Sequence, residues 1–154
     1  MLKTNLNTEV AVKELMDIFV DRLRNNLSSL GKAVSGNLIN SLEYKIQKNN
    51  TGFTATLTAA DYLEVVDKGR RPGKFPPPDQ IKKWVQAKGI TIGTLDQTAF
   101  VISRSIARKG IKATDVINKS FNEAFNIYKI KFAEKVAKDF EDMIDQINLK
   151  INKK

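Results

Sequence analysis

The residues with the clearest chemical potential are cations in the middle of the chain. Lysine and arginine bind phosphate groups without reading base sequence, and each neutralised phosphate steepens the salt dependence of binding. Arg104, Arg108 and Lys112 follow one another at intervals of one helical turn, which predicts that they share a face. The pattern favours a polyanionic or acidic partner, with an ordinary solvated surface as the alternative. The predicted contact residues are Arg70, Arg71, Lys74, Lys82, Lys83, Arg104, Arg108 and Lys112.

No constellation of residues in the sequence supports catalysis. The chain has no cysteine and no histidine, so thiol nucleophiles, disulfides and histidine bases are excluded. Ser103 and Ser105 lack a base that could activate a hydroxyl, and no glycine-rich phosphate-binding motif is present. Asp61, Glu64 and Asp67 are spaced to share a helix face and could hold a divalent ion, but solvated acids are the simpler interpretation. We predict no enzyme, no catalytic residue, no metal and no cofactor.

The net charge of +9 is concentrated in the middle of the 154-residue chain. Residues 61–112 hold 11 cations and 5 acids, whereas the segments before and after them carry net charges of only +2 and +1. Such a field favours a polyanionic partner, above all nucleic acid. The sequence has no apolar run of membrane-spanning length, and its first residues lack the pattern of a signal peptide. We therefore expect assembly in the cytoplasm and no membrane partner.

Apolar periodicity predicts an α+β fold with a small antiparallel sheet packed against several helices. Steps of three and four indicate a helix over residues 8–30, with Asn7 or Thr8 as its N-cap. A short helical turn follows in residues 35–42, and over residues 42–60 the period becomes two, which predicts a β-hairpin. Since an isolated hairpin is marginal in water, we expect a further strand or a partner's strand beside it.

The central segment combines a proline-rich loop with short helices. Residues 61–68 fit neither the helical nor the strand period strictly, and the three prolines at 76–78 stiffen the approach to the next helix. Asp79 is expected to cap that helix and Gly89 to end it, and Thr94 is expected to cap a second helix that Gly110 closes. Aromatic residues here are interpreted as core anchors rather than stacking platforms. The residues expected to face the core are Phe75, Trp84, Phe100, Val101 and Ile106.

The last segment carries the longest apolar stripe. From about residue 114 to residue 150, apolar residues recur in steps of three and four, which predicts one helix roughly 55 Å long. A compact domain of this length is only about 40 Å across. We predict a single domain whose last helix extends beyond the core to face another subunit; a break near Asn126 or a frayed tail is the alternative. The predicted interface residues are Phe132, Val136, Phe140, Ile144 and Ile147.

The order of several short motifs resembles one protein family. SGNLINSL at residues 35–42 precedes the hairpin, and YLEVVDKGRRP at residues 62–72 and PPPDQIKKWV at residues 76–85 follow it. ISRSIARKGIKA at residues 102–113 completes the order. In this order the sequence is similar to the neck or tail-completion proteins of tailed bacteriophages, also called minor tail or head-tail joining proteins. The matching positions are Gly36, Leu38, Ser41, Tyr62, Val66, Asp67, Gly69, Pro77, Pro78, Trp84 and residues 109–111.

The resemblance covers about residues 30–125 and implies a structural virion protein, assembled in the host cytoplasm. It implies a homo-oligomeric ring between the head connector and the tail, with virion proteins on both sides as partners and DNA in the channel as a further contact. Closed rings use heterologous contacts, which would let the last helix of one subunit cover the exposed stripe of the next. The alternative is a basic, sequence-nonspecific DNA-binding protein.

Overall fold

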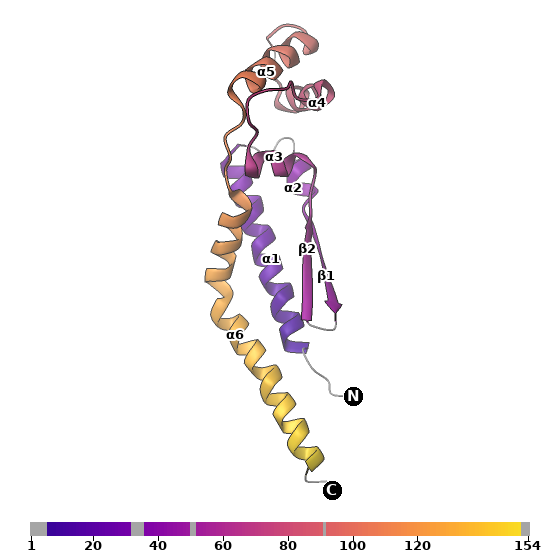
Figure 1. Ribbon diagram of the computed structural model, residues 1–154, viewed down its shortest axis with the longest axis vertical. Helices are drawn as coiled ribbons and strands as arrows, with labels where there is room; N and C mark the ends of the chain where they lie inside the picture. The colour runs from indigo at the N-terminus through magenta and orange to yellow at the C-terminus, as the bar shows by residue number, and fades with distance from the viewer. Residues whose placement is uncertain (1–5, 32–35, 50–51, 91, 152–154) are drawn as a thin grey trace. The chain divides into compact units, whose positions relative to one another are not determined.

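The computed structural model describes residues 6–31, 36–49, 52–90 and 92–151 (Figure 1). These residues form an α+β fold with one two-stranded antiparallel sheet and long helices near both ends of the chain, as the sequence predicts. None of the described helices is both long enough and apolar enough to cross a membrane. The elements in chain order are α1 Leu6–Ser29, α2 Asn37–Asn40, β1 Glu43–Asn49, β2 Gly52–Thr58, α3 Tyr62–Lys68, α4 Pro78–Lys88, α5 Leu95–Lys109 and α6 Val116–Ile151.

The contacts of the chain divide it into two compact units. The first unit comprises residues 1–23, 43–57 and 119–154, and the second comprises residues 24–42 and 58–118. The first unit therefore contains the hairpin and most of α1 and α6, and the second contains α2, α3, α4 and α5. The expectation of a single domain stays a prediction, because this division of contacts does not test it.

In the first unit, α1 and α6 pack side by side and run antiparallel (Figure 1). Phe19 meets Phe121 edge-on, with ring centroids 5.5 Å apart. Further along, Glu14 accepts hydrogen bonds from the Tyr128 hydroxyl and from the Lys135 ammonium group, the latter at 2.9 Å. These bonds, that of Tyr128 first, lower the pKa of Glu14. The register of the two helices is thus set by polar pairs as well as by apolar packing.

Asp139 of α6 caps the N-terminus of α1. Its carboxylate accepts backbone hydrogen bonds from Asn7 at 3.1 Å and Thr8 at 2.7 Å, and side-chain bonds from the same two residues. Burial raises the pKa of Asp139, but the bonds from Thr8 and Asn7 outweigh burial and hold the pKa below its ordinary value. The prediction that Asn7 or Thr8 is the N-cap is wrong, because α1 begins at Leu6 and a side chain from another helix satisfies these N–H groups.

The hairpin predicted over residues 42–60 is confirmed as β1 and β2, and its turn at residues 50–51 lies outside the described residues. Tyr44 holds β1 against α1 by donating a hydrogen bond to Asp17 at 2.5 Å. Burial, and then this bond, raises the pKa of Tyr44 to about 12. Within the described residues the sheet has two strands, so the chain supplies no further strand there. A partner's strand stays a prediction.

The second unit begins with two short helices. Helix α2 confirms the helical turn predicted at residues 35–42, of which residue 35 lies outside the described residues. The Ser41 hydroxyl donates to the Leu38 carbonyl at 2.8 Å and accepts from the Ala60 N–H at 2.9 Å, which closes this turn. Residues 61–68, which were ambiguous between helix and strand, form helix α3.

Asp67, in the last turn of α3, caps the N-terminus of α6. Its carboxylate accepts a hydrogen bond from the Ile117 N–H at 2.9 Å, and its carbonyl accepts from the N–H groups of Thr114 and Asp115. The residue is only 8% exposed, so its interpretation as one of three solvated acids is wrong. Across the described residues, no group of three or more acidic side chains is arranged to hold a metal ion.

Two glycines let the chain approach itself closely at the base of α4 and α5. Arg70 and Ile111 exchange two backbone hydrogen bonds, of 2.8 and 2.7 Å. A Cβ atom at Gly69 would lie 2.4 Å from the Ile111 carbonyl oxygen, and one at Gly110 would lie 2.3 Å from the Arg70 carbonyl oxygen. Both glycines also have a φ of +73°, which side chains disfavour. The geometry therefore accepts only glycine at these positions.

Helices α4 and α5 pack against each other, and three of their four predicted caps are confirmed, with Gly110 as the C-cap of α5. Gly89 ends α4 in the left-handed conformation, and Thr94 caps α5 in a reciprocal pair with Gln97. Asp79 is not a cap, because α4 already begins at Pro78 and Asp79 lies in its first turn.

The buried face of α5 differs from the predicted one. Phe100 and Val101 are 58% and 50% exposed, so the prediction that they face the core is wrong. The buried residues of α5 are instead small: Thr98, Ala99 and Ser103. Small side chains let a helix approach its neighbours closely, which leaves the larger ones at the surface. Of the other residues expected to face the core, Trp84 and Ile106 are half-buried.

Candidate functional site

The basic residues gather in α4, α5 and their flanking segments, residues 69–112, which we call the α4–α5 arm. The arm holds ten lysines and arginines but only two acids, a net charge of +8 out of +9 for the chain. The other residues together are almost neutral. The arm is therefore the part of the molecule with the strongest attraction for anions.

The loop before α4 lies along α5. Its start is fixed by the backbone pair between Arg70 and Ile111, and the Gly73 N–H then donates to the Ala107 carbonyl at 2.8 Å. The loop thus runs antiparallel to the last turns of α5, where two of the predicted arginines lie. The loop that carries Arg70, Arg71 and Lys74 therefore lies beside the end of α5 that carries Arg104 and Arg108.

Of the cations predicted to contact a partner, two are bonded within the arm and six are exposed. Arg70 is half-buried, and its guanidinium group donates to the Lys74 carbonyl at 2.9 Å. Lys82 forms an ion pair with Asp96 at 2.5 Å, and this hydrogen bond raises the pKa of Lys82. These two side chains stabilise the arm itself. The exposed members of the set are Arg71, Lys74, Lys83, Arg104, Arg108 and Lys112.

Arg104 and Arg108 lie one turn apart on α5, as predicted, but Lys112 does not continue their row. Helix α5 ends at Lys109 and Gly110 turns the chain, so Lys112 lies in the segment that follows. Sequence reasoning also missed Lys109, which is exposed in the last turn. Cations at this end of a helix interact favourably with its dipole, so part of this charge has a structural role.

An exposed aromatic pair lies in the same arm. The rings of Phe75 and Phe100 stack with centroids 6.0 Å apart, although the two residues are 52% and 58% exposed. The prediction that Phe75 is a core anchor is therefore wrong. Arg104 lies one turn after Phe100 on α5, and this spacing was the signal that could have marked Phe100 as a surface residue. Exposed aromatic rings beside arginine are typical of protein interfaces and of platforms on which bases stack.

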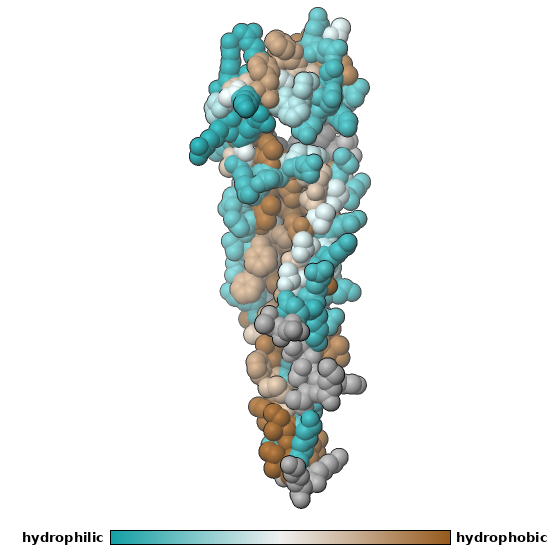
Figure 2. All heavy atoms as spheres, turned by 45° about the vertical axis from the view of Figure 1, so that its right-hand side comes forward, coloured by the Kyte–Doolittle hydropathy of each residue, from teal (hydrophilic) through white to brown (hydrophobic). Residues whose placement is uncertain are grey.

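Helix α6 extends beyond the helix it pairs with. Asp139 lies beside the first turn of α1, so residues 140–151, which we call the α6 tail, continue past the start of α1. The helix is continuous over its 36 residues, about 54 Å, so the alternative of a break near Asn126 is wrong. Apolar atoms gather toward the C-terminal end of α6 in Figure 2.

The predicted interface residues fall into two groups along α6. Phe132 and Val136 are half-buried, in the stretch that lies beside α1. The three residues in the tail are exposed: Phe140 at 59%, Ile144 at 54% and Ile147 at 42%. Ile151, which was not predicted, continues their row at 65%. The tail therefore presents an uncovered apolar stripe, which consists of Phe140, Ile144, Ile147 and Ile151.

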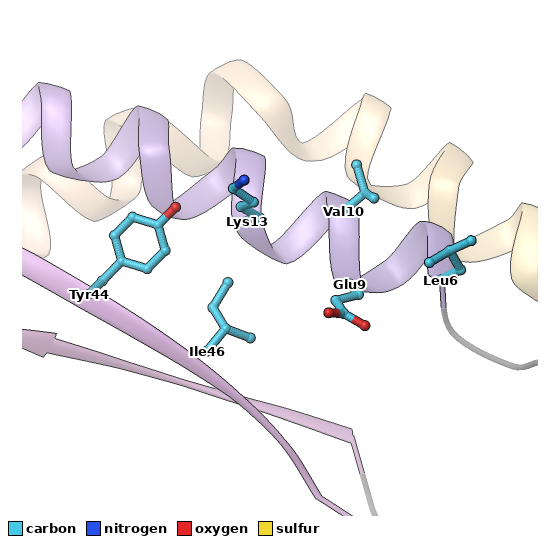
Figure 3. Close-up of a pocket in the computed structure, with 6 residues that line it drawn as sticks. All are labelled: Leu6, Glu9, Val10, Lys13, Tyr44 and Ile46. Atoms are coloured by element: carbon cyan, nitrogen blue, oxygen red, sulfur yellow. The ribbon is translucent and has the colours of Figure 1, made fainter.

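An apolar groove of about 320 Å³ lies between α1 and β1 in the first unit (Figure 3). Tyr44 and Ile46 extend from β1 toward α1, which supplies the remaining lining residues. Two of these, Leu6 and Val10, are 72% and 40% exposed. Sequence patterning did not predict the groove, because the residues of its two walls are more than 30 positions apart in the sequence. The lining residues are Leu6, Glu9, Val10, Lys13, Tyr44 and Ile46.

Comparison of the chain with protein-family models, with curated proteins and with solved structures found no match. Three surfaces of the molecule are therefore the functional candidates, namely the α4–α5 arm, the α6 tail and the groove, and the order of motifs in the sequence stands beside them.

Proposed function

We propose that this chain is a structural virion protein of a tailed bacteriophage, which forms a ring in the neck and joins the head connector to the tail around the DNA channel. The observation that carries the proposal is the α6 tail, whose apolar stripe is between 42% and 65% exposed. Soluble monomers rarely leave a contiguous apolar surface uncovered, whereas a subunit of an assembly buries it against the next copy. The motif order resembling neck proteins also supports this function.

The α4–α5 arm suits a second contact in the same assembly. Its exposed cations and the Phe75–Phe100 pair combine charge with aromatic surface, a composition typical of interfaces with other proteins. The backbone hydrogen bonds between Arg70 and Ile111, beside Gly69 and Gly110, tie the two ends of the arm to each other. In the proposed neck, the arm contacts an acidic neighbouring virion protein or the DNA that passes through the ring.

A basic, sequence-nonspecific DNA-binding protein is the second candidate function. The observation that favours it is the net charge of +8 confined to residues 69–112. A free DNA-binding protein of this kind would bind duplex DNA with a steep salt dependence. A neck subunit needs no such affinity, because the channel itself confines the DNA.

We predict that removing three exposed cations of the arm separates the two candidates. The variant carries Arg71→Ala, Arg104→Ala and Arg108→Ala, and its control carries Lys45→Ala, Lys119→Ala and Lys129→Ala, which removes the same charge from exposed positions outside the arm and the tail. For a neck subunit, wild-type binding to free duplex is weak, and the arm variant alone reduces the joining of heads to tails in an in vitro assembly assay. Duplex affinity is measured by fluorescence anisotropy over a series of salt concentrations.

Tight duplex binding by the wild type would favour the alternative. In that case the slope of log affinity against log salt should fall by about 3 in the arm variant and hardly at all in the control. Normal head-tail joining by the arm variant would contradict the proposed role of the arm.

A further inference from the structure

The exposed rings of the α4–α5 arm lie on the same face of α5 as one of its arginines. Phe75 of the loop stacks on Phe100 of α5. Further along the loop, the Gly73 N–H donates to the Ala107 carbonyl at 2.8 Å. Positions 100 and 107 share a helix face, and Arg104 lies between them in steps of four and three. Arg104 is therefore on the face along which the loop runs, one turn from the ring of Phe100.

Four exposed cations lie in the same two segments as the rings. Arg104 and Arg108 are one turn apart on α5, about 6 Å along its axis, and the loop contributes two more. No ion pair between the described residues involves any of the four, whereas Asp96 of the arm is already paired with Lys82. This surface therefore keeps its charge for an external anion. We call it the aromatic face, and it consists of Arg71, Lys74, Phe75, Phe100, Arg104 and Arg108.

The two rings of the aromatic face are open to solvent although they cover each other in part. Phe75 is 52% and Phe100 is 58% exposed. A second stacked pair, Phe121 and Phe125 on α6, has centroids 6.4 Å apart, but Phe121 also packs edge-on against Phe19. The chain after residue 112 has a net charge of only +1, so this second pair lacks the surrounding charge of the arm. The second pair thus offers an internal comparison.

We propose that the aromatic face binds single-stranded nucleic acid, with a base stacked on the Phe75–Phe100 pair and phosphates held by the neighbouring cations. Sites for single strands combine cations that follow the backbone with aromatic rings on which bases stack. In a duplex the bases are already paired and stacked, so these rings would gain little from it. The inference goes beyond the proposed neck function and does not depend on it. It also differs from the duplex binding of the second candidate function.

An acidic protein surface fits the aromatic face less well than a single strand does. The core of a protein–protein interface is depleted of charge, and the interface buries about 800 Å² on each partner. Here Lys74 directly precedes Phe75, and Arg104 follows Phe100 by one turn, so cations adjoin both rings. The close mixture of rings and cations matches a polymer in which bases and phosphates alternate.

The inference predicts a preference among three anions of equal length: oligo-dT of about ten nucleotides, its duplex with oligo-dA, and polyglutamate. Fluorescence anisotropy of labelled probes measures their affinities for the full chain. Stacking of one base strengthens binding by roughly 5-fold or more, so oligo-dT should bind at least about 5-fold more tightly than either competitor. The duplex carries twice the charge of oligo-dT, so equal or tighter binding of the duplex would overturn the inference. Tighter binding of polyglutamate would do the same and would indicate an acidic protein partner.

Phe100→Leu separates stacking from apolar contact, because leucine keeps an apolar side chain but removes the ring. This variant should bind oligo-dT at least about 5-fold more weakly than the wild type. Its control is Phe125→Leu, which changes a 42% exposed ring outside the arm and should bind like the wild type. Circular dichroism checks that both variants are folded. Equal affinities of the two variants would contradict stacking on the arm.

The salt dependence distinguishes the two parts of the aromatic face. Arg104→Ala with Arg108→Ala should lower the slope of log affinity against log salt by about 1.4 for oligo-dT, since two phosphate contacts are lost. Phe100→Leu should weaken binding without changing this slope, because a stacked base releases no counterion. A slope that is unchanged in the double arginine variant would contradict the assigned phosphate contacts.

Ultraviolet cross-linking of oligo-dT, followed by mass spectrometry of the peptides, locates the strand directly. Cross-links should fall on the segments that contain Phe75 and Phe100, and cross-links confined to other segments would overturn the inference. Oligo-U in place of oligo-dT distinguishes RNA from DNA as the ligand, and preferential binding of either strand supports the site. Normal head-tail joining by Phe100→Leu would leave the proposed function intact, so the two proposals can fail separately.

Discussion

Replacing Gly110 by alanine is expected to lower the free energy of unfolding by about 3 kcal/mol or more. The new Cβ atom would lie 2.3 Å from the Arg70 carbonyl oxygen and 3.0 Å from the Pro72 ring. The backbone at Gly110, with φ of 73° and ψ of −167°, is in a region that only glycine adopts readily. Neither cost can be relieved locally, because the Arg70 carbonyl is held by its hydrogen bond from Ile111.

Gly89→Ala is the matched control for this prediction. Gly89 also has a positive φ, of 62°, but no atom lies within 4 Å of the position of its Cβ. The control should therefore lose only about 1 kcal/mol, the cost of a left-handed residue with a side chain. In thermal unfolding, Gly110→Ala should lower Tm by roughly 6 to 12 °C and Gly89→Ala by about a third of that. Equal decreases in Tm for the two variants would contradict the close approach between Gly110 and the backbone of Arg70.

Asp139→Asn is expected to destabilise the pairing of α1 and α6 by about 2 to 3 kcal/mol at neutral pH. The carboxylate accepts hydrogen bonds from both the backbone and the side chains of Asn7 and Thr8, at 2.6 to 3.1 Å. An asparagine side chain has only one oxygen that can accept hydrogen bonds from these donors. Its NH₂ group is itself a donor and cannot replace the second carboxylate oxygen. As a control, Asp145→Asn changes an exposed residue of the same helix and should alter the free energy of unfolding by less than about 0.5 kcal/mol.

The effect of Asp139→Asn should also depend on pH. The folded pKa of Asp139 is below its ordinary value, so its contribution is fully present above the unfolded pKa, about 3.9, and is lost as the pH falls through the folded pKa. The stability difference between wild type and variant should therefore shrink below about pH 4. Urea unfolding over a pH series measures it, and amide exchange at Asn7 and Thr8 reports the cap itself. A difference that is constant with pH would show that the carboxylate charge is not what matters.

The predictions that succeeded depend on residues close together in the sequence. The period of apolar residues predicted α1, α6 and the hairpin, and the pair of Thr94 and Gln97 lies within one helical turn. Gly89 is likewise a local signal, because a left-handed helix end favours glycine wherever it occurs.

The predictions that failed depend on partners far away in the chain. Asp139 caps a helix whose first residues precede it by more than 130 positions, and Asp67 caps one that begins about 50 positions later. Nothing in the local sequence distinguishes such an aspartate from a solvated one. The buried face of α5 was mispredicted for the same reason. The apolar residues of this helix lie on several of its sides, so the segments packed against it decide that Thr98 and Ala99 are buried while Phe100 is exposed.

The candidate site was predictable in composition but not in geometry. The cations of the arm and the stripe of α6 are visible as residue types, yet the loop lies along α5 only because Gly69 and Gly110 allow two backbones to meet. That approach also brings Phe75 onto Phe100. The groove needs α1 and β1 together, so the printed sequence could not show it.

The central claim is that the apolar stripe of the α6 tail is covered by another copy in the assembled particle. The most direct measurement is the mass of the full chain in solution by sedimentation velocity, alone and with the head connector of the same particle. We predict a species several times the 17.3 kDa of one chain, which Ile144→Asp with Ile147→Asp converts to single copies. A wild type that stays at 17.3 kDa at every concentration, with and without the connector, would contradict the account.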